Sequence, residues 1–386
     1  MRSPGARARA LGVNLLVLGA ALLLPLGVLE CALRAFPERL LPAGSYGAGA
    51  YSPELGLNVH RGTAYYNKLR FVERRANADG FMDVEHAREK PPGTLRVGFF
   101  GDSYVEALQV PLDATFFRRL PERVAGRPLE PFAFGRSGWG AIHALTVWRT
   151  FGPRYQLDAV AYVFVENDPG DSDLVLQRAL GRLTPAMLYA ELSDEPPGFR
   201  VVQPHPGGRR PFPMNLVKLA QERSLLVQLA VNRVLLLREA GVQTRADAAQ
   251  VEMTSRAGAV PDQNDAPSSW PPEHLGRVKE LNRRILAAFQ REVAAAGARF
   301  FVVYVPRGDR QLRGELAPAD TFRAWLGETC RTLGIPLVDP TPELAARLAA
   351  GHAMYDDHFT REGHAVVAQV IARDLEGWAA AASAGP

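Results

Sequence analysis

Short apolar runs alternate with helical segments over most of this chain, and this alternation constrains the fold more than any other feature. The expected strands are 95–100, 131–134, 159–165, 300–305 and 335–338. The expected helices are 141–150, 275–296, 322–333 and 363–375, with a further helical face at Phe116, Phe117 and Leu120. Strands that are nearly continuous in apolar residues are typical of a parallel sheet covered on both faces. We therefore expect an α/β fold with three α/β/α layers around a mostly parallel five-stranded sheet.

The segment 1–36 is interpreted as a cytoplasmic tip followed by a transmembrane helix. No residue in 10–29 is charged, and about 20 apolar residues suffice for a helix to cross a bilayer. Arg2, Arg7 and Arg9 precede this stretch, so the positive-inside rule places the remainder in the periplasm or outside the cell. A cleaved signal peptide shares this pattern, but no Ala-x-Ala-like cleavage site follows. We expect an uncleaved, single-pass membrane anchor.

We expect the rest of the chain to divide into an N-terminal extension at 37–93 and a domain at 94–380, on which the extension packs. An insertion at about 168–273 interrupts this domain, because the rhythm of strands and helices breaks there. Within the insertion, 243–269 is polar and aperiodic, which predicts a flexible surface loop. The net charge of +4 is small, and no basic stripe interleaved with aromatic residues indicates nucleic-acid binding. The two cysteines, Cys31 and Cys330, do not form a disulfide framework.

Several chemically active residues follow the expected strands. Ser103 comes directly after the first strand, in Gly101-Asp102-Ser103, while Gly138 and Asn167 follow the second and third. In parallel sheets, ligands bind outside the carboxyl ends of the strands. Near the other end of the chain, Asp356 and His358 stand two residues apart. These residues therefore form the candidate site.

The residue types in this set match the needs of acyl transfer. A serine hydroxyl becomes a nucleophile when a histidine takes its proton, and a carboxylate then orients the imidazole. We expect Asp356 to be this acid, with the adjacent Asp357 as its rival. A glycine N–H and a side-chain amide can stabilise an oxyanion. A metal site using Asp356, His358 and His364 is the competing interpretation, but it lacks further ligands at a recognisable spacing.

The chain resembles the SGNH (GDSL-type) hydrolase superfamily, and its membrane-anchored, polysaccharide-associated bacterial members in particular. The resemblance spans about 77–375 and is carried by Gly101-Asp102-Ser103-Tyr104, Gly135-Arg136-Ser137-Gly138, Val165-Glu166-Asn167-Asp168, Asp356-Asp357-His358 and Gly363-His364. It implies a flavodoxin-like fold with Ser103 as nucleophile, His358 as base and Asp356 as its orienter. It also implies an oxyanion hole of the Ser103 N–H, the Gly138 N–H and the Asn167 side chain. Val165 and Tyr355 depart from the family pattern, which usually has glycine and the acid there.

The resemblance predicts a serine-dependent ester hydrolase that acts on an acyl or acetyl ester, such as the O-acetyl groups of a cell-surface glycan. An O-acyltransferase that uses the same triad is the alternative, and a non-catalytic component of glycan assembly is the second alternative. No cofactor and no metal are implied. The expected partners are an ester-bearing small molecule or glycan, the membrane through residues 10–29, and proteins of polysaccharide assembly.

Overall fold

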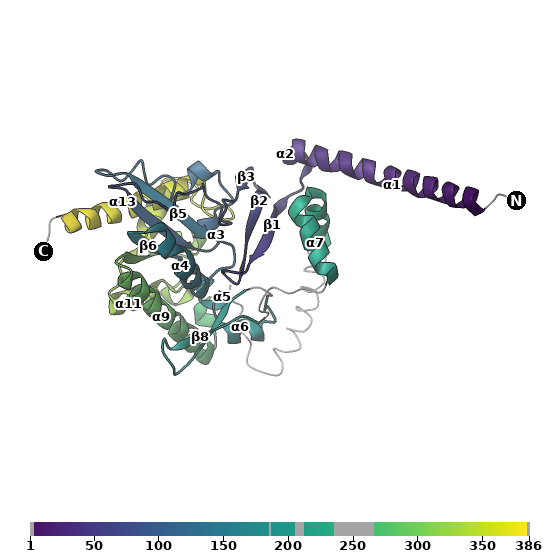
Figure 1. The fold of residues 1–386 in the computed structure, drawn as a ribbon. Helices are drawn as coiled ribbons and strands as arrows, with labels where there is room; N and C mark the ends of the chain where they lie inside the picture. Colours follow the sequence, from purple (N-terminus) through teal and green to yellow (C-terminus); the bar gives the residue numbers. More distant parts are fainter. Residues whose placement is uncertain (1–3, 185–186, 205–211, 235–265, 384–386) are drawn as a thin grey trace.

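A five-stranded parallel sheet lies at the centre of the protein (Figure 1). The structure is a computed structural model that describes residues 4–184, 187–204, 212–234 and 266–383. The strands of the sheet are β4 (Leu95–Gly101), β5 (Leu129–Gly135), β6 (Ala159–Phe164), β9 (Arg299–Tyr304) and β10 (Leu337–Val338). They are arranged in the order β10-β9-β6-β4-β5, and every pairing is parallel. Numbered along the chain this is the flavodoxin-like order 2-1-3-4-5, so the predicted fold class is confirmed.

Helices cover both faces of this sheet. One face packs against α4 (Ala141–Tyr155), α9 (Pro272–Ala295) and α11 (Arg323–Leu333), and the other against α12 (Thr341–Ala349) and α13 (Arg361–Ser383). Successive strand residues point to opposite faces, and the adjacent Phe99 and Phe100 accordingly belong to opposite core clusters. Because both faces are buried, all seven residues of β4 are buried. This explains the continuous apolar runs in the sequence.

The helix expected around Phe116, Phe117 and Leu120 does not form. Between β4 and β5 the chain makes the single turn α3 (Ser103–Glu106), the 3-10 helix η1 (Leu112–Ala114) and a series of turns. Pro111 and Pro121 bracket the expected helix, and proline has no N–H to continue a helical ladder. The three apolar side chains are nevertheless buried against the sheet. Their spacing correctly marked a core face but not the helix that was inferred from it.

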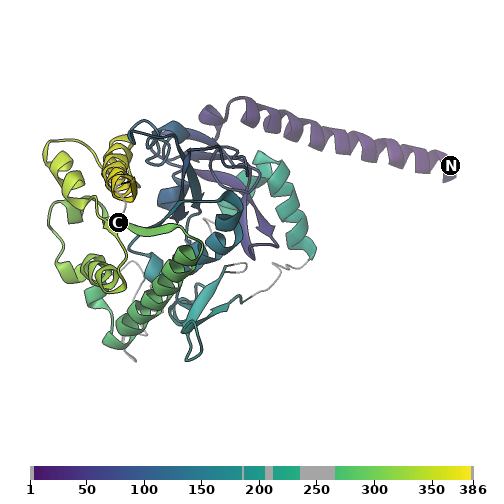
Figure 2. The same ribbon diagram turned by 60° about the vertical axis from the view of Figure 1, so that its left-hand side comes forward.

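A second, antiparallel sheet precedes the main one in the chain. It consists of β1 (Gly44–Ser52), β2 (Leu57–Asn67) and β3 (Phe71–Arg75), in that order. Figures 1 and 2 show it standing between the main sheet and the N-terminal helices α1 (Pro4–Ala35) and α2 (Pro37–Leu40). It lies on the side of the main sheet where α3 begins, which is the carboxyl edge of the parallel strands.

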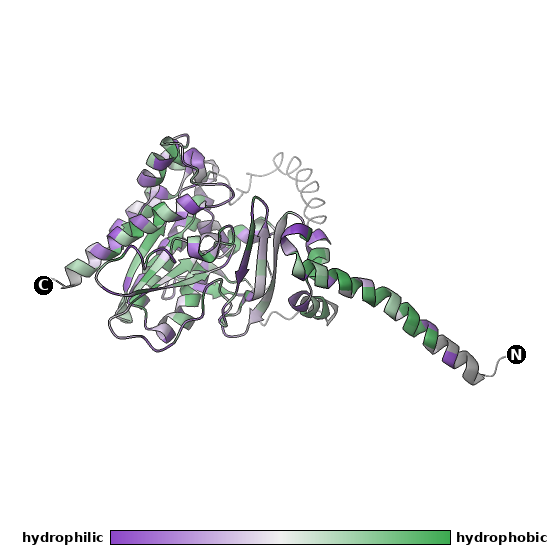
Figure 3. Cartoon of the chain, turned by 90° about the horizontal axis from the view of Figure 1, so that it is seen from above, coloured by the Kyte–Doolittle hydropathy of each residue, from purple (hydrophilic) through white to green (hydrophobic). Residues whose placement is uncertain are grey.

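Helix α1 projects away from the rest of the molecule, and its surface is hydrophobic over most of its length (Figure 3). Its segment Gly12–Ala35 has a mean hydropathy of 2.3 and is long and apolar enough to cross a membrane. The last turns of α1 contact the folded domain. Glu30 accepts hydrogen bonds from the Ser224 hydroxyl and from the N–H groups of Leu225 and Leu226, and Leu33 is buried beside Leu225.

The remaining elements are short. The predicted insertion contains α5 (Asp168–Asp171), α6 (Leu174–Ala179), the hairpin β7 (Tyr189–Leu192) and β8 (Phe199–Val202), α7 (Phe212–Arg223) and a helical segment Leu225–Val234. The surface loop predicted at 243–269 lies outside the described residues up to position 265, and its end forms the 3-10 helix η3 (Pro267–Ser269). After β9 come α10 (Gly308–Leu312) and the 3-10 helix η4 (Pro318–Asp320).

Candidate active site

The backbone at the end of β4 presents Ser103 at the carboxyl edge of the parallel sheet. Asp102 caps the short helix α3, and its carboxylate accepts a hydrogen bond from the Tyr104 N–H. Helix α3 packs closely on the end of β5: a Cβ at Gly135 would lie 2.5 Å from the Cβ of Val105. Only a residue without a side chain permits this approach. The two glycines that end β4 and β5, Gly101 and Gly135, are paired in register, so the backbone fixes where the serine stands.

The structure brings Ser103 and His358 together across 255 residues of sequence. Ser103 Oγ lies 2.8 Å from His358 Nε2, which is hydrogen-bonding distance. The histidine sits in a tight loop closed by the bridge between Tyr355 and Phe359, and its ring centroid lies 4.6 Å from that of Tyr104. Burial lowers the pKa of His358 below its ordinary value of 6.5. A neutral imidazole at neutral pH can accept the serine proton.

The acid nearest to the imidazole is Asp357. Its Oδ2 lies 3.5 Å from His358 Nδ1, and the same oxygen accepts hydrogen bonds from the Tyr66 hydroxyl at 3.2 Å and from Lys68 Nζ at 3.3 Å. Burial alone would raise the pKa of Asp357, but the charges of His358 and Lys68 and the hydrogen bonds from Lys68 and Tyr66 bring it below its ordinary value. Asp357 is therefore a carboxylate at neutral pH.

The predicted acid, Asp356, has different partners. Its Oδ2 accepts a hydrogen bond from Arg70 at 2.5 Å, and its Oδ1 accepts from the N–H of Asp357 at 2.6 Å. The Asp356 N–H in turn donates to the His358 carbonyl, which closes the loop. A charge-assisted pair with arginine holds a carboxylate firmly. The structure thus places Asp356 in the loop that carries His358 and places Asp357, the rival considered from sequence, beside the ring.

Three side chains at the site come from the N-terminal sheet and were missed by sequence reasoning. Tyr66 lies on β2, and Lys68 and Arg70 lie in the turn that joins β2 to β3. No motif marks them, because their partners are about 290 residues away in the chain. An alternation of tyrosine and charge in an otherwise unassigned extension carries no signal for a particular contact. Only the packing of the two sheets reveals it.

The N-terminal sheet also contacts helix α3, which begins at Ser103. Glu106, the last residue of α3, is buried and forms an ion pair with His60 of β2, while its other oxygen accepts the Ser137 N–H at 3.1 Å. Burial would raise the pKa of Glu106, but bonding and charge from His60 outweigh it and lower the pKa to about 2. Arg74 of β3 donates to the carbonyls of Ala107 and Val110 just after α3. The antiparallel sheet therefore shares a buried polar interface with α3 and the loop after β5, beneath the candidate site.

The predicted oxyanion donors follow neighbouring strands at the same edge. Gly138 lies in the loop after β5 with a φ of +79°, a backbone conformation that favours glycine, and the space beside its Cα is open. Asn167 follows β6, and one N–H of its side-chain amide donates to Asp171 at 2.7 Å. Burial raises the pKa of Asp102 to about 7.

The metal site considered as an alternative, with Asp356, His358 and His364, is not supported by the described residues. Among the described residues, no cluster of three or more His, Cys, Asp or Glu side chains is placed to hold a metal ion. His364 is buried, and its Nδ1 accepts the Phe116 N–H at 3.2 Å. Burial lowers the pKa of His364 to about 3. Its ring is thus part of the core packing behind the site.

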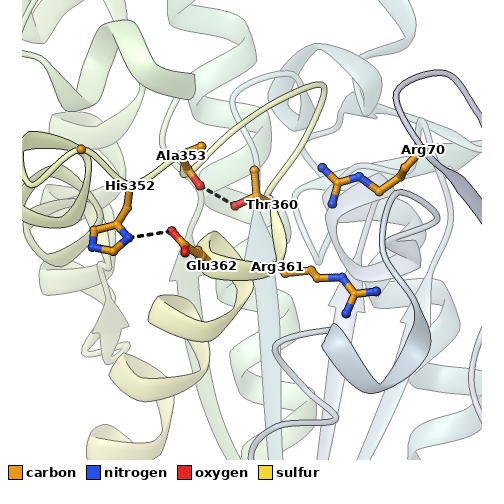
Figure 4. A pocket seen from close by; sticks show the side chains of 7 residues that line it. Arg70, His352, Ala353, Thr360, Arg361 and Glu362 are labelled. Carbon is orange, nitrogen blue, oxygen red and sulfur yellow. Dashed lines mark hydrogen bonds and ion pairs between the residues drawn. The ribbon is translucent and has the colours of Figure 1, made fainter.

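A pocket of about 330 Å³ lies beside the loop that carries the acids. Figure 4 shows its lining, which consists of Arg70, Gly351, His352, Ala353, Thr360, Arg361 and Glu362. His352 Nδ1 and Glu362 Oε2 are 3.0 Å apart, and the Thr360 hydroxyl donates to the Ala353 carbonyl, so both ends of the loop are tied together. Arg70 lines the pocket and also binds Asp356.

Comparisons with known proteins give a limited result. No family model matches the chain, and no curated protein matches it. Solved structures that it resembles include TesA, with 12% identity over 74% of this chain and 98% of that one and a TM-score of 0.38. A GDSL-like lipase from Bacteroides thetaiotaomicron has 10% identity over 76% of this chain and 92% of its own, with a TM-score of 0.35. An acetyl-xylooligosaccharide esterase from Geobacillus Stearmophilus, an Axe2 mutant, has 11% identity over 73% of this chain and 94% of its own, with a TM-score of 0.37. At these scores the likeness carries no argument about chemistry, which must come from the site itself.

Proposed function

We propose that the protein is a serine-dependent ester hydrolase of the SGNH type. The single observation that carries the proposal is the 2.8 Å contact between Ser103 Oγ and His358 Nε2. It occurs at the carboxyl edge of a parallel sheet, where such folds bind their ligands. A nucleophile, a neutral base and a carboxylate behind the base are the parts that ester cleavage requires.

The reaction proceeds through an acyl-enzyme. Ser103 Oγ attacks the ester carbonyl carbon while His358 Nε2 takes the hydroxyl proton. The tetrahedral intermediate collapses, the C–O bond to the alcohol breaks, and the imidazolium gives its proton to the leaving alkoxide. Water then attacks the acyl-serine with His358 again as base, which releases the carboxylic acid and restores the serine. No step needs a metal or a cofactor.

We assign the orienting role to Asp357. Its carboxylate is the one beside Nδ1 of His358, at 3.5 Å, and catalytic hydrogen bonds are often this long in the absence of substrate. Tyr66 and Lys68 hold Asp357 from behind. Asp356 shapes the loop through Arg70. This assignment replaces the prediction from the resemblance, which favoured Asp356.

We assign the oxyanion hole to the Gly138 N–H and the Asn167 amide, with the Ser103 N–H as the third donor. The support is their position on the loops after β5 and β6 and at the start of α3. Gly138 is exposed beside open space, so a substrate oxygen can approach its N–H. Loss of one such donor typically lowers turnover by ~10²–10³.

We further propose that α1 is retained as a membrane anchor, with the catalytic domain outside the cytoplasm. A signal peptide that is removed by cleavage is not expected to make specific contacts with the mature folded domain. Here, by contrast, Glu30 accepts three hydrogen bonds from residues 224–226, and Leu33 is buried against the domain. These contacts favour an uncleaved helix. The proposed substrates are acyl or acetyl esters, with the O-acetyl groups of a cell-surface glycan as the class that the family resemblance favours.

Covalent labelling tests the chemistry directly. A fluorophosphonate should phosphonylate Ser103 of the purified full-length protein, located by mass spectrometry of the modified peptide. Ser103→Ala should abolish the label, and Ser45→Ala, a control at an exposed serine of β1, should keep it. A folded protein that takes up no label, or an unchanged label in Ser103→Ala, contradicts the proposal.

Incubation with an acetylated glycan then separates the hydrolase from the transferase. Release of acetate into water indicates a hydrolase, and transfer of the acetyl group to a sugar hydroxyl indicates a transferase.

A further inference from the structure

We infer that the active site opens at the surface of the membrane and takes esters that are held on the bilayer. This inference rests on the proposed function, because it uses Ser103 as the nucleophile and α1 as the anchor. It concerns the class of substrate: an acyl ester on a lipid or on a glycan attached to a lipid, presented within reach of the membrane surface.

A short path of contacts joins the end of the anchor to the catalytic loop. Helix α1 ends at Ala35, and the Leu41 carbonyl, six residues further on, accepts a hydrogen bond from Asn67 at 2.7 Å. Six residues span at most about 20 Å even when fully extended. Asn67 is the last residue of β2, and the next residue, Lys68, already binds Asp357. The catalytic acid is therefore tied to the chain just beyond the anchor.

Strand β2 contacts both the end of the anchor helix and the catalytic loop. Tyr65 of β2 packs in the cluster that contains Leu33 of α1 and Leu41. Tyr66, whose side chain points to the opposite face of the strand, donates to Asp357. The antiparallel sheet thus acts as a stiff spacer of one strand's thickness between the anchor and the site. A flexible tether would leave the height of the site above the membrane undefined, whereas this packing defines it.

The surface around this path is apolar and exposed. Leu69, between Lys68 and Arg70, the cations that bind Asp357 and Asp356, is 64% exposed, and Phe36 beside the end of α1 is 55% exposed. Leu216 and Leu219 of α7 are 52% and 44% exposed. Helix α7 runs at a steep angle to α1 beside its domain-proximal end (Figures 1 and 2). Side chains of this kind are stabilised at a lipid interface, and their continuity with α1 indicates that the bilayer covers them.

A site at this height above the membrane favours esters that are attached to the bilayer over esters in solution. A bilayer-held ester close to Lys68-Leu69-Arg70 meets Ser103 without leaving the surface, and its local concentration at the site is raised by the shared membrane. Linking a reactant to the same support commonly gains 10²–10⁴ in effective concentration. A soluble ester of equal reactivity lacks this gain.

Two probes with one fluorophosphonate group test the inference in full-length protein embedded in vesicles of phosphatidylethanolamine and phosphatidylglycerol. One probe carries the group on the phosphatidylethanolamine headgroup through a short spacer, and the other carries it on a soluble oligoethylene glycol. We expect the lipid probe to label Ser103 at least tenfold faster at equal total concentration. Equal rates, or faster labelling by the soluble probe, overturn the inference but leave the proposed function intact. Absence of label from both probes in folded protein contradicts the proposed function itself.

A variant that lifts the domain off the membrane provides the control. It carries Glu30→Ala together with a flexible Gly/Ser linker of about 30 residues between Phe36 and Pro37, which adds a root-mean-square length of about 30 Å. This variant should keep the rate of the soluble probe and lose the advantage of the lipid probe. An advantage that survives the linker overturns the inference, because it would not come from the height of the site.

Natural-type substrates then separate the two sources of ester. Vesicles that contain an acetylated sugar on a lipid carrier report acetate release, and phospholipid in the same vesicles reports fatty-acid release. Either product, at a rate well above that from the same acetylated sugar in solution, supports the inference and names the source. A faster reaction with the soluble sugar contradicts it.

Discussion

The two sheets of this protein hold the proposed catalytic residues by different physical means. The parallel sheet fixes Ser103 through backbone geometry in a core where every residue of β4 is buried. The antiparallel sheet holds the acids through side chains at the surface, with Lys68 49% exposed and Asp357 35% exposed. Buried packing tolerates little change, whereas exposed ion pairs contribute little energy and are screened by salt.

This contrast predicts different roles for the two sheets: the parallel sheet positions Ser103, and the antiparallel sheet adjusts the properties of His358 through its contacts with Asp356 and Asp357. Substitutions on the parallel sheet should abolish activity or destabilise the fold. Substitutions of the exposed residues beside the acids, such as Lys68, should leave the fold intact and change the protonation or the orientation of His358. The expected effects therefore differ in size, and five substitutions, each with a control or a partner variant, test them.

Removing the base should have the largest effect. His358→Ala leaves Ser103 without a proton acceptor, so hydrolysis of p-nitrophenyl acetate should fall by on the order of 10⁴-fold or more. Because His358 is partly exposed and its backbone hydrogen bonds do not need the ring, the melting temperature should change little. His352→Ala removes a half-exposed histidine that contacts Glu362 and not Ser103; it is the matched control and should retain activity. A residual rate within tenfold of the unmodified protein would show that another group is the base.

The two neighbouring acids should differ sharply. Asp357→Asn removes the carboxylate beside Nδ1 and should lower kcat by about 10²–10⁴, as loss of an orienting acid does in such triads. Asp356→Asn keeps the loop contacts of Asp356 Oδ1 and should cost tenfold or less. Comparing kcat and KM of both variants on one ester decides between them. If Asp356→Asn is the more damaging change, Asp356 is the acid, as the family resemblance implied.

The parallel sheet could be predicted because its physical signal is local. Continuous apolar runs, glycines at the strand ends and polar residues after them were all visible in the sequence, and the structure places Ser103, Gly138 and Asn167 at one edge of the sheet. The contacts on which the proposal of Asp357 as the acid rests could not be predicted, because Arg70, which binds Asp356, lies 286 residues away in the chain. Spacing along the chain favours neither carboxylate when a distant sheet supplies the competing charge.

The packing of α3 on the strand ends should be the most sensitive backbone contact. Gly135→Ala places a Cβ 2.5 Å from that of Val105 and 2.7 Å from the Glu106 N. Overpacking of this kind costs about 1–3 kcal/mol, measurable as a lower midpoint of urea denaturation. Gly62→Ala in the antiparallel sheet has open space around it but a φ of +67°, so it is a matched control for glycine loss without a clash. Gly135→Ala should reduce fluorophosphonate labelling and Gly62→Ala should not.

The smallest effect should be a shift in the pH dependence of labelling. Burial lowers the pKa of His358, and Lys68 lowers it further while Asp357 raises it. The neutral ring is the active form, so the labelling rate should rise with pH to a plateau, with its midpoint below pH 6.5. Lys68→Met removes a repelling positive charge, which raises the pKa of His358 and moves the midpoint to higher pH. Asp357→Asn removes an attracting negative charge and should move it to lower pH.

The direction of these two shifts is a sharper test than their size. Because Lys68 is half exposed, its effect should shrink as salt is added, since exposed charges are screened within about 10 Å at 0.1 M. Lys90→Met removes a cation that pairs with Asp158 just before β6, at the far end of the parallel strands, and should leave the midpoint unchanged. Shifts of the same sign in Lys68→Met and Asp357→Asn would mean that at least one of the two groups does not act on His358 through its charge. A shift of the midpoint to lower pH in Lys68→Met would mean that the antiparallel sheet does not tune His358 through the charge of Lys68.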